Sequence, residues 1–246
     1  MYENKIKQID ILKNEISQLR PLSQREIIKL KEYYKIGLTY TSNALEGNFL
    51  TESETKIVIE DGITIGGKSL KDHYEVVGHA QAYDFLYKLV NKKNIEEKDI
   101  LELHRLFYYR IDELNAGKYR QEQVYISGTD FLPPKPEAVF GLMKDFIQNI
   151  IKLEKELHPI EFAAKFHLDF VTIHPFIDGN GRCARLLMNL VLLRFGYVIT
   201  IIPAILRHDY IEAIKKSQKM KADKPFVDFI SCMVYESMKD YLRLVK

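Results

Sequence analysis

Residues 174–185 read HPFIDGNGRCAR and join two apolar stretches of the chain. Pro175 prevents simple continuation of the helical pattern before it, and a second helical pattern begins at the glycines. Gly179 and Gly181, on either side of Asn180, allow unusual backbone dihedrals and a close approach to a ligand. Because they lead directly into a helix, free N–H groups and the positive end of the helix dipole face whatever precedes it. The stretch therefore predicts a helix–loop–helix joint with an anion site.

Four side chains of this loop suit nucleotide phosphates. Arg182 and Arg185 are three positions apart, so both can reach polyanionic oxygens from one face of the first helical turn. Asp178 is a hard oxygen ligand of the kind that Mg²⁺ uses beside phosphates. His174 is a candidate general base. Each residue alone is also typical of an ordinary turn, helix end or solvated surface, and it is their combination in this order that favours phosphate chemistry.

Helical patterns extend outward from the loop over most of the chain. Capping boxes at Ser23 and Thr51, and prolines suited to first-turn positions, mark several helix starts. The exception is GKYRQEQVYISGTDFLPP, residues 117–134, in which Gln123–Ser127 has a strand pattern. We expect an all-α fold with a small β-hairpin flap. The expected helices begin near residues 6, 23, 51, 69, 97, 136, 159, 181, 204 and 225.

Composition and charge exclude several classes of protein. Of the 246 residues, 46% are hydrophobic and 28% charged, which is typical of a globular domain rather than a disordered or fibrous chain. The formal net charge of +2 gives no reason to expect nucleic acid or an anionic membrane as partner. Cys183 and Cys232 form no CxxC pattern, and residues 1–13 lack the apolar core of a signal peptide. We expect a cytoplasmic protein without a membrane span.

The loop resembles the signature of Fic-domain proteins, HxFx(D/E)GN(G/K)RxxR, at every defined position. The resemblance extends through the flap and through TIGGKSLKDHYEV, residues 64–76, and covers roughly residues 38–242. It implies a helical Fic fold and a nucleotidyltransferase that transfers AMP from ATP to a Tyr, Thr or Ser hydroxyl of a protein target, with self-modification included. We expect residues 1–37 to be an N-terminal helical extension, able to form a homo-oligomer contact, and residues 38–246 to be the Fic domain.

The resemblance also implies a role for each loop residue. His174 corresponds to the base that deprotonates the target hydroxyl, and Asp178 to the ligand of Mg²⁺ or Mn²⁺. Arg182 corresponds to the group that stabilises charge on the transferred and leaving groups, and Arg185 to the partner of the γ-phosphate. The backbone cradle for the phosphates corresponds to Gly179, Asn180 and Gly181.

Two further sets of residues take roles from the same resemblance. Tyr210 lies where related proteins place an adenine contact, although an aromatic residue at this spacing is also typical of a core. The flap edge is expected to pair with an extended target segment by strand addition. That edge consists of Val124, Tyr125, Ile126, Ser127, Gly128 and Thr129.

The segment SNALEGN, residues 42–48, resembles the (S/T)xxxE(G/N) inhibitory motif that some Fic proteins carry ahead of the catalytic loop. By this resemblance Glu46 pairs with Arg185 and occupies the γ-phosphate position, while Ser42 helps to fix the helix. Taken alone, the motif is equally typical of an ordinary helix end.

Three alternatives to an autoinhibited adenylyltransferase remain at this point. Kinase-like relatives carry Lys where this chain has Gly181, which favours AMP transfer. A hydrolase that removes AMP would use the same residues, with Glu46 orienting a water. A non-catalytic binding module would be expected to lack His174 or Arg182, and both are present.

Overall fold

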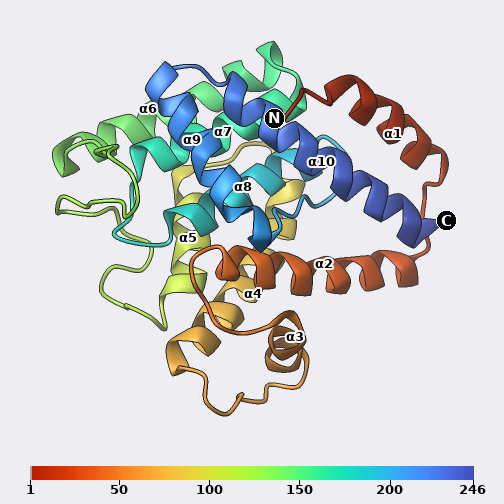
Figure 1. Ribbon diagram of the computed structural model, residues 1–246, viewed down its shortest axis with the longest axis horizontal. Helices are drawn as coiled ribbons and strands as arrows, with labels where there is room; N and C mark the ends of the chain where they lie inside the picture. The colour runs from red at the N-terminus through yellow and green to blue at the C-terminus, as the bar shows by residue number, and fades with distance from the viewer. Residues whose placement is uncertain (1) are drawn as a thin grey trace.

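The computed structural model describes residues 2–246, and within this range the chain is helical and contains no strand (Figure 1). The predicted all-α class is therefore confirmed. The elements are α1 (Ile6–Gln18), α2 (Gln24–Ala44), α3 (Glu52–Glu60), α4 (Leu70–Val90), α5 (Glu97–Tyr108), α6 (Pro136–Glu156), α7 (Pro159–Ile173), α8 (Asn180–Arg194), the 3₁₀ turn η1 (Ala204–Leu206), α9 (Arg207–Met220) and α10 (Lys224–Val245).

Helix α8 lies at the centre of the molecule and packs against α7, α4, α5 and α2 (Figure 1). Its residues from Arg182 to Leu192 are all buried, which explains why the run from Leu186 to Leu192 is apolar around the whole circumference. The polar exception in its apolar run is Asn189, whose amide donates to the carbonyls of Thr200 and Arg185 and accepts from the Thr200 N–H. A buried amide that is fully paired in this way joins α8 to the segment that follows it.

The first two helices pack on different partners. Helix α1 lies against α10, whereas α2 lies against α3 and α4. Ser23 and Thr51 form the capping boxes expected at the starts of α2 and α3. Helix α2 is continuous across residues 37 and 38, so the division there into an extension and a Fic domain stays a prediction. This helix carries residues of the region 1–37 and of the motif 42–48 on one rigid element.

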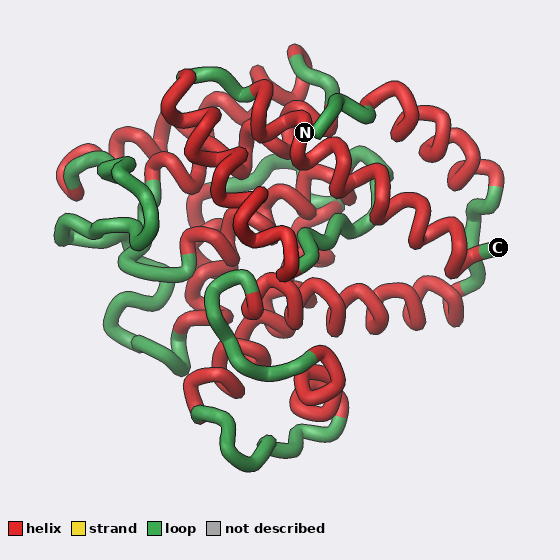
Figure 2. The backbone as a smooth tube through the Cα atoms, in the orientation of Figure 1, coloured by secondary structure: helices red, strands yellow, loops and turns green. Residues whose placement is uncertain are grey.

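The expected β-hairpin flap is wrong in its secondary structure, because residues 117–134 form a loop (Figure 2). Side chains take the place of a strand ladder: the Gln123 amide donates to the Pro133 carbonyl, and the Arg120 guanidinium donates to the carbonyls of Glu122 and Pro134. The two prolines have no N–H to offer an opposite strand. The alternating pattern of Gln123–Ser127 therefore has no partner strand within residues 2–246.

None of the helices within residues 2–246 has both the length and the apolar character needed to span a bilayer.

Two glycines test how tightly the helices around α8 are packed. A Cβ on Gly78 of α4 would lie 2.6 Å from the Phe107 Cα and 2.7 Å from its carbonyl oxygen on α5, whereas a Cβ on Gly141 of α6 would meet nothing within 4 Å. We predict that Gly78→Ala lowers the free energy of unfolding by about 1–3 kcal/mol, since backbone cannot move aside cheaply. Gly141→Ala should raise it by about 0.5–1 kcal/mol. Urea denaturation of both variants measures this, and equal effects would contradict the close crossing of α4 and α5.

Candidate active site

His174 ends helix α7 in the left-handed conformation, with φ of 53°, which is uncommon for a residue with a side chain. Its N–H donates to the Phe170 carbonyl at 2.9 Å and its carbonyl accepts from Arg120 Nε at 2.8 Å. Its Nδ1 lies 3.2 Å from the Val171 carbonyl, so Nδ1 carries the proton and the lone pair of the neutral ring is on Nε2. Burial lowers the pKa of His174. The imidazole is thus neutral and able to accept a proton at neutral pH.

The loop that follows is held by its own side chains. The Asn180 amide accepts from the Phe176 N–H and donates to the Phe176 carbonyl, both at 2.9 Å, so it shapes the loop while its backbone opens α8. Gly179 has φ of 78°, and a Cβ there would meet the Phe107 ring at 2.5 Å. His104 Nε2 donates to the Asp178 carbonyl at 3.1 Å. These contacts fix the loop on α5 and leave the Asp178 side chain 51% exposed.

Arg182 is a buried cation, 2% exposed, whose main partner is Glu75 of α4 at 2.8 Å. The Asp178 carboxylate lies 3.6 Å away, and the guanidinium sits over the Phe107 ring at 5.2 Å from its centroid. Glu75 also accepts from the Asn48 amide at 2.9 Å. The charge of Arg182 is therefore neutralised by Glu75 of α4, and Asn48 in the turn after α2 holds Glu75 in position.

Arg185 is fully enclosed and is held by the end of α2. Its Nη2 donates to Glu46 Oε1 at 2.7 Å and to the Ser42 carbonyl at 2.8 Å, and its Nε donates to Ser42 Oγ at 2.9 Å. Burial alone would raise the pKa of Glu46, but the guanidinium groups of Arg185 and Arg182 hold that pKa below its usual range. Glu46 is thus an anion bound directly to Arg185.

A cavity of about 580 Å³ brings half of the predicted residues together. Its walls include His174, Gly181, Glu46, Tyr210 and the loop residues 126–129. The apolar part of the wall comes mainly from isoleucines of η1 and α9. The other predicted residues of the loop do not line this cavity: Asp178 and Gly179 precede α8, and Asn180, Arg182 and Arg185 lie on its first turns. Val124 and Tyr125 continue the same loop outside this wall, and Tyr125 is 82% exposed.

Tyr210 lines the cavity, but its hydroxyl points inward. The hydroxyl lies 2.8 Å from His167 Nε2 and accepts from Arg185 Nη1 at 3.3 Å. The residue is 3% exposed. Tyr210 therefore helps to position Arg185, in addition to any contact that its ring makes with a ligand.

Two residues that shape the site are absent from the sequence-based prediction. Glu75 balances Arg182, and Arg120 donates to carbonyls on both sides of the 117–134 loop and to His174. Arg120 is 2% exposed, so this one guanidinium ties the loop to the candidate base. Both residues lie in segments that carry the Fic resemblance, but no local spacing distinguishes them from surface charges.

Comparison with known proteins adds to this geometry. Residues 94–192 match the Fic/DOC family. The solved structure of Fic-1, residues 134–508, from C. elegans superposes with a TM-score of 0.86 at 32% identity, covering 96% of this chain and 70% of that one. The chain belongs to the Fic/DOC family. The resemblance read from the loop is confirmed.

Other relatives of this Fic chain agree. It is 40% identical over 206 residues to a protein named protein adenylyltransferase Fic from Nematostella vectensis, covering 82% of this chain and 48% of the relative. A Fic domain containing signaling protein from Bacteroides thetaiotaomicron superposes with a TM-score of 0.89 at 28% identity, over 96% of this chain and 97% of that one. The Fic chain thus spans about half the length of the curated relatives that it matches.

The pairing of Arg182 with Glu75 gives a stability prediction. Glu75→Ala should lower the free energy of unfolding by about 3 kcal/mol, because it leaves a buried cation without its closest anion. Glu75→Ala/Arg182→Ala should be destabilised by less than the sum of the two single variants. The control is Glu60→Ala, which breaks an exposed pair with Lys56 at 3.9 Å and should change stability by less than about 0.5 kcal/mol. Additive effects of Glu75 and Arg182 in a denaturation series would argue against the pair.

Proposed function

We propose that this Fic chain is a protein adenylyltransferase that transfers AMP from ATP to a Tyr, Thr or Ser hydroxyl of a protein target. The observation that carries the proposal is the shared cavity, in which a neutral histidine, a helix N-terminus and an exposed loop edge meet. A base, an anion-binding helix start and a peptide-binding edge are the parts that such a transfer needs. The names of its relatives support the same reaction.

His174 performs the proton transfer. Its unprotonated Nε2 accepts the proton of the target hydroxyl, and the hydroxyl oxygen attacks the α-phosphorus of ATP. The bond from the α-phosphorus to the bridging oxygen of the β-phosphate breaks, so pyrophosphate leaves and AMP stays on the target. The proton remains on the imidazole, which returns it to solvent. The hydrogen bonds of Nδ1 and of the His174 carbonyl hold the ring in place for this step.

The first turn of α8 binds the phosphates. Its N–H groups lack helical partners, and the buried guanidinium of Arg182 adds a positive charge close to them. Asp178 suits Mg²⁺ or Mn²⁺, because its side chain is half exposed and Mg²⁺ is usually bound by one or two carboxylates together with substrate phosphates. A metal held there supplies positive charge to the phosphate oxygens. Charge stabilisation and positioning then account for the catalysis expected of the loop.

The 117–134 loop offers the target a backbone edge. Residues 124–129 make no backbone–backbone hydrogen bond to the rest of residues 2–246. Apart from the Val124 carbonyl, which accepts from the Gln123 amide at 3.2 Å, their backbone N–H and C=O groups are therefore free to pair. An extended target segment added here would place its hydroxyl on the side of the cavity that holds His174.

Glu46 inhibits the enzyme in this arrangement. Its carboxylate is bound to the guanidinium of Arg185, which the γ-phosphate needs. The same carboxylate lies so close to Gly181 that a Cβ on residue 181 would collide with Oε1. Ser42 holds the same guanidinium through two hydrogen bonds. ATP can bind productively only after Glu46 has left Arg185, so we propose that the resting protein is autoinhibited.

His174→Ala should lower AMP transfer by about 10²–10⁴-fold, because the variant has no base at this position. Mass spectrometry after incubation with ATP and Mg²⁺ measures the product. An AMP adduct supports the proposal. A phosphate adduct would indicate a kinase, and loss of AMP from a modified protein would indicate a hydrolase. Because burial lowers the pKa of His174 from its usual value of 6.5, the pH at which the wild-type rate has fallen to half should lie below 6.5. Transfer by His174→Ala at the wild-type rate would exclude His174 as the base.

Glu46→Gly should raise AMP incorporation by about 10²-fold. A misplacement of the phosphates by about 1 Å can lower the rate by about 10²-fold, and the variant removes the carboxylate that displaces them. Adding Arg185→Ala to it should reverse the gain, since the partner of the γ-phosphate is then lost. The matched control is Glu60→Gly, at the end of α3, which should incorporate AMP like wild type. If Glu46→Gly and wild type incorporate equal amounts, the autoinhibition is wrong. A double variant as active as Glu46→Gly would remove Arg185 from its role.

A further inference from the structure

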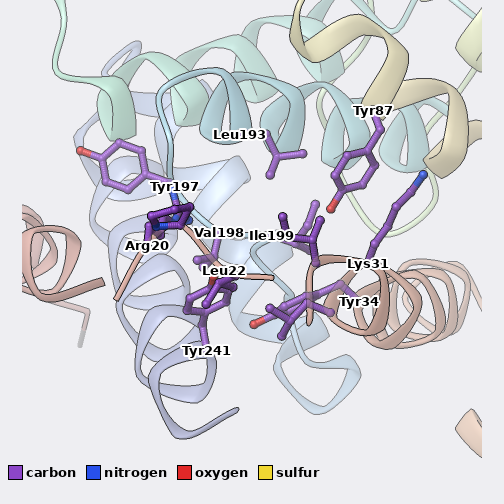
Figure 3. A pocket seen from close by; sticks show the side chains of 13 residues that line it. Arg20, Leu22, Lys31, Tyr34, Tyr87, Leu193, Tyr197, Val198, Ile199 and Tyr241 are labelled. Carbon is purple, nitrogen blue, oxygen red and sulfur yellow. The ribbon is translucent and has the colours of Figure 1, made fainter. Parts of the chain in front are cut away.

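A second cavity, of about 570 Å³, lies between the segment that joins α1 to α2, the first half of α2, residues 197–199 after α8 and Tyr241 of α10. Its walls share no residue with the cavity that holds His174. Figure 3 shows Tyr34 and Tyr241 on one side of it and Leu193 and Tyr87 on the other. Nothing in the chemistry proposed above uses this space.

The cavity has the composition of a small-molecule site. Leucine, isoleucine, valine and proline side chains and tyrosine rings make up most of its wall. Sites for small ligands are typically about 300–1,000 Å³, mainly apolar, and carry a few polar groups that orient the ligand. The polar groups present here therefore indicate which ligand would fit.

The first of these groups is the hydroxyl of Tyr34. It is buried, the residue being 5% exposed, and has no hydrogen-bond partner within residues 2–246. The ring stacks on Tyr241 with centroids 6.5 Å apart. Burial raises the pKa of Tyr34, so the hydroxyl remains a neutral donor. A buried donor without an acceptor is unfavourable, and a ligand that brings an acceptor would correct this.

The second group is the guanidinium of Arg20. It donates to the Gly196 carbonyl at 3.3 Å and lies 5.9 Å from the centroid of the Tyr241 ring, and no carboxylate within residues 2–246 pairs with it. The nearby cation Lys31 is already paired with Asp84 at 3.5 Å. Arg20 and Tyr34 thus both lie against Tyr241. An acceptor that carries a negative charge suits both a hydroxyl donor and a guanidinium.

We propose that this cavity is a binding site for an aliphatic carboxylate, such as a medium-chain fatty acid. The alkyl chain packs against Leu30, Leu193 and the tyrosine rings. The carboxylate accepts from the Tyr34 hydroxyl and pairs with Arg20. The proposal does not depend on the proposed adenylyltransferase activity, because binding is measured directly and at a different cavity.

The probes are three molecules that share one alkyl chain: decanoate, decanol and decyltrimethylammonium. Calorimetric titration into the full chain, below the concentrations at which the probes form micelles, should give the order of affinity decanoate, decanol, decyltrimethylammonium. Tyr34→Phe should weaken decanoate binding by about tenfold, the effect of losing one hydrogen bond to a charged group. The matched control is Tyr33→Phe, because Tyr33 is 52% exposed and does not line the cavity.

Two more variants locate the site. Arg20→Gln should remove the preference for decanoate over decanol, whereas Arg25→Gln, on the exposed start of α2, should keep it. Leu30→Trp should fill the cavity and abolish binding of both, with circular dichroism to verify the fold. Equal affinity for all three probes, no binding of decanoate, or decanoate binding unchanged by Tyr34→Phe and Leu30→Trp would each overturn the proposal.

Discussion

Two guanidinium groups buried on the central helix determine how the helices around them are arranged. Arg182 and Arg185 lie on the first turns of α8, both nearly inaccessible to solvent. An ionised group in such a place must be paired and hydrogen-bonded, since otherwise its burial is prohibitively unfavourable. The partners are Glu75 of α4 and the end of α2 with Ser42 and Glu46. The positions of α2 and α4 beside α8 follow from this requirement as much as from apolar packing.

The same need for partners holds the two guanidinium groups in fixed positions at the candidate active site. The cations that would stabilise phosphate charge are held in place before any ligand arrives, so they need no rearrangement when the charge develops. Arg120 extends this principle to the 117–134 loop, because its guanidinium donates to the carbonyl of His174 and to the Glu122 and Pro134 carbonyls of the loop. The candidate base His174 and the expected target edge are therefore positioned by one buried side chain. A rigid support of this kind suits an exposed loop that has no strand partner of its own.

Local signals in the sequence were enough to predict where the helices begin and that residues 174–185 join two of them. Capping boxes and first-turn prolines depend on neighbouring residues, and the capping boxes at Ser23 and Thr51 formed as expected. The expected strand at Gln123–Ser127 failed because a strand needs a partner, and the choice of partner is not local. Glu75 was missed for the same reason, since it meets Arg182 only through the packing of α4 on α8. The inward hydroxyl of Tyr210 also depends on a distant residue, His167.

Gly181 of the 174–185 loop leaves free the space in which the Glu46 carboxylate lies. A Cβ at this position would collide with Glu46 Oε1 and lie 3.0 Å from Arg185 Nη1. The carboxylate and a side chain at residue 181 thus compete for one small space. Both colliding atoms lie at the ends of flexible side chains, so a larger residue at position 181 would push the Glu46 carboxylate aside and lengthen its 2.7 Å ion pair with Arg185. The glycine at this position therefore helps to keep that ion pair short.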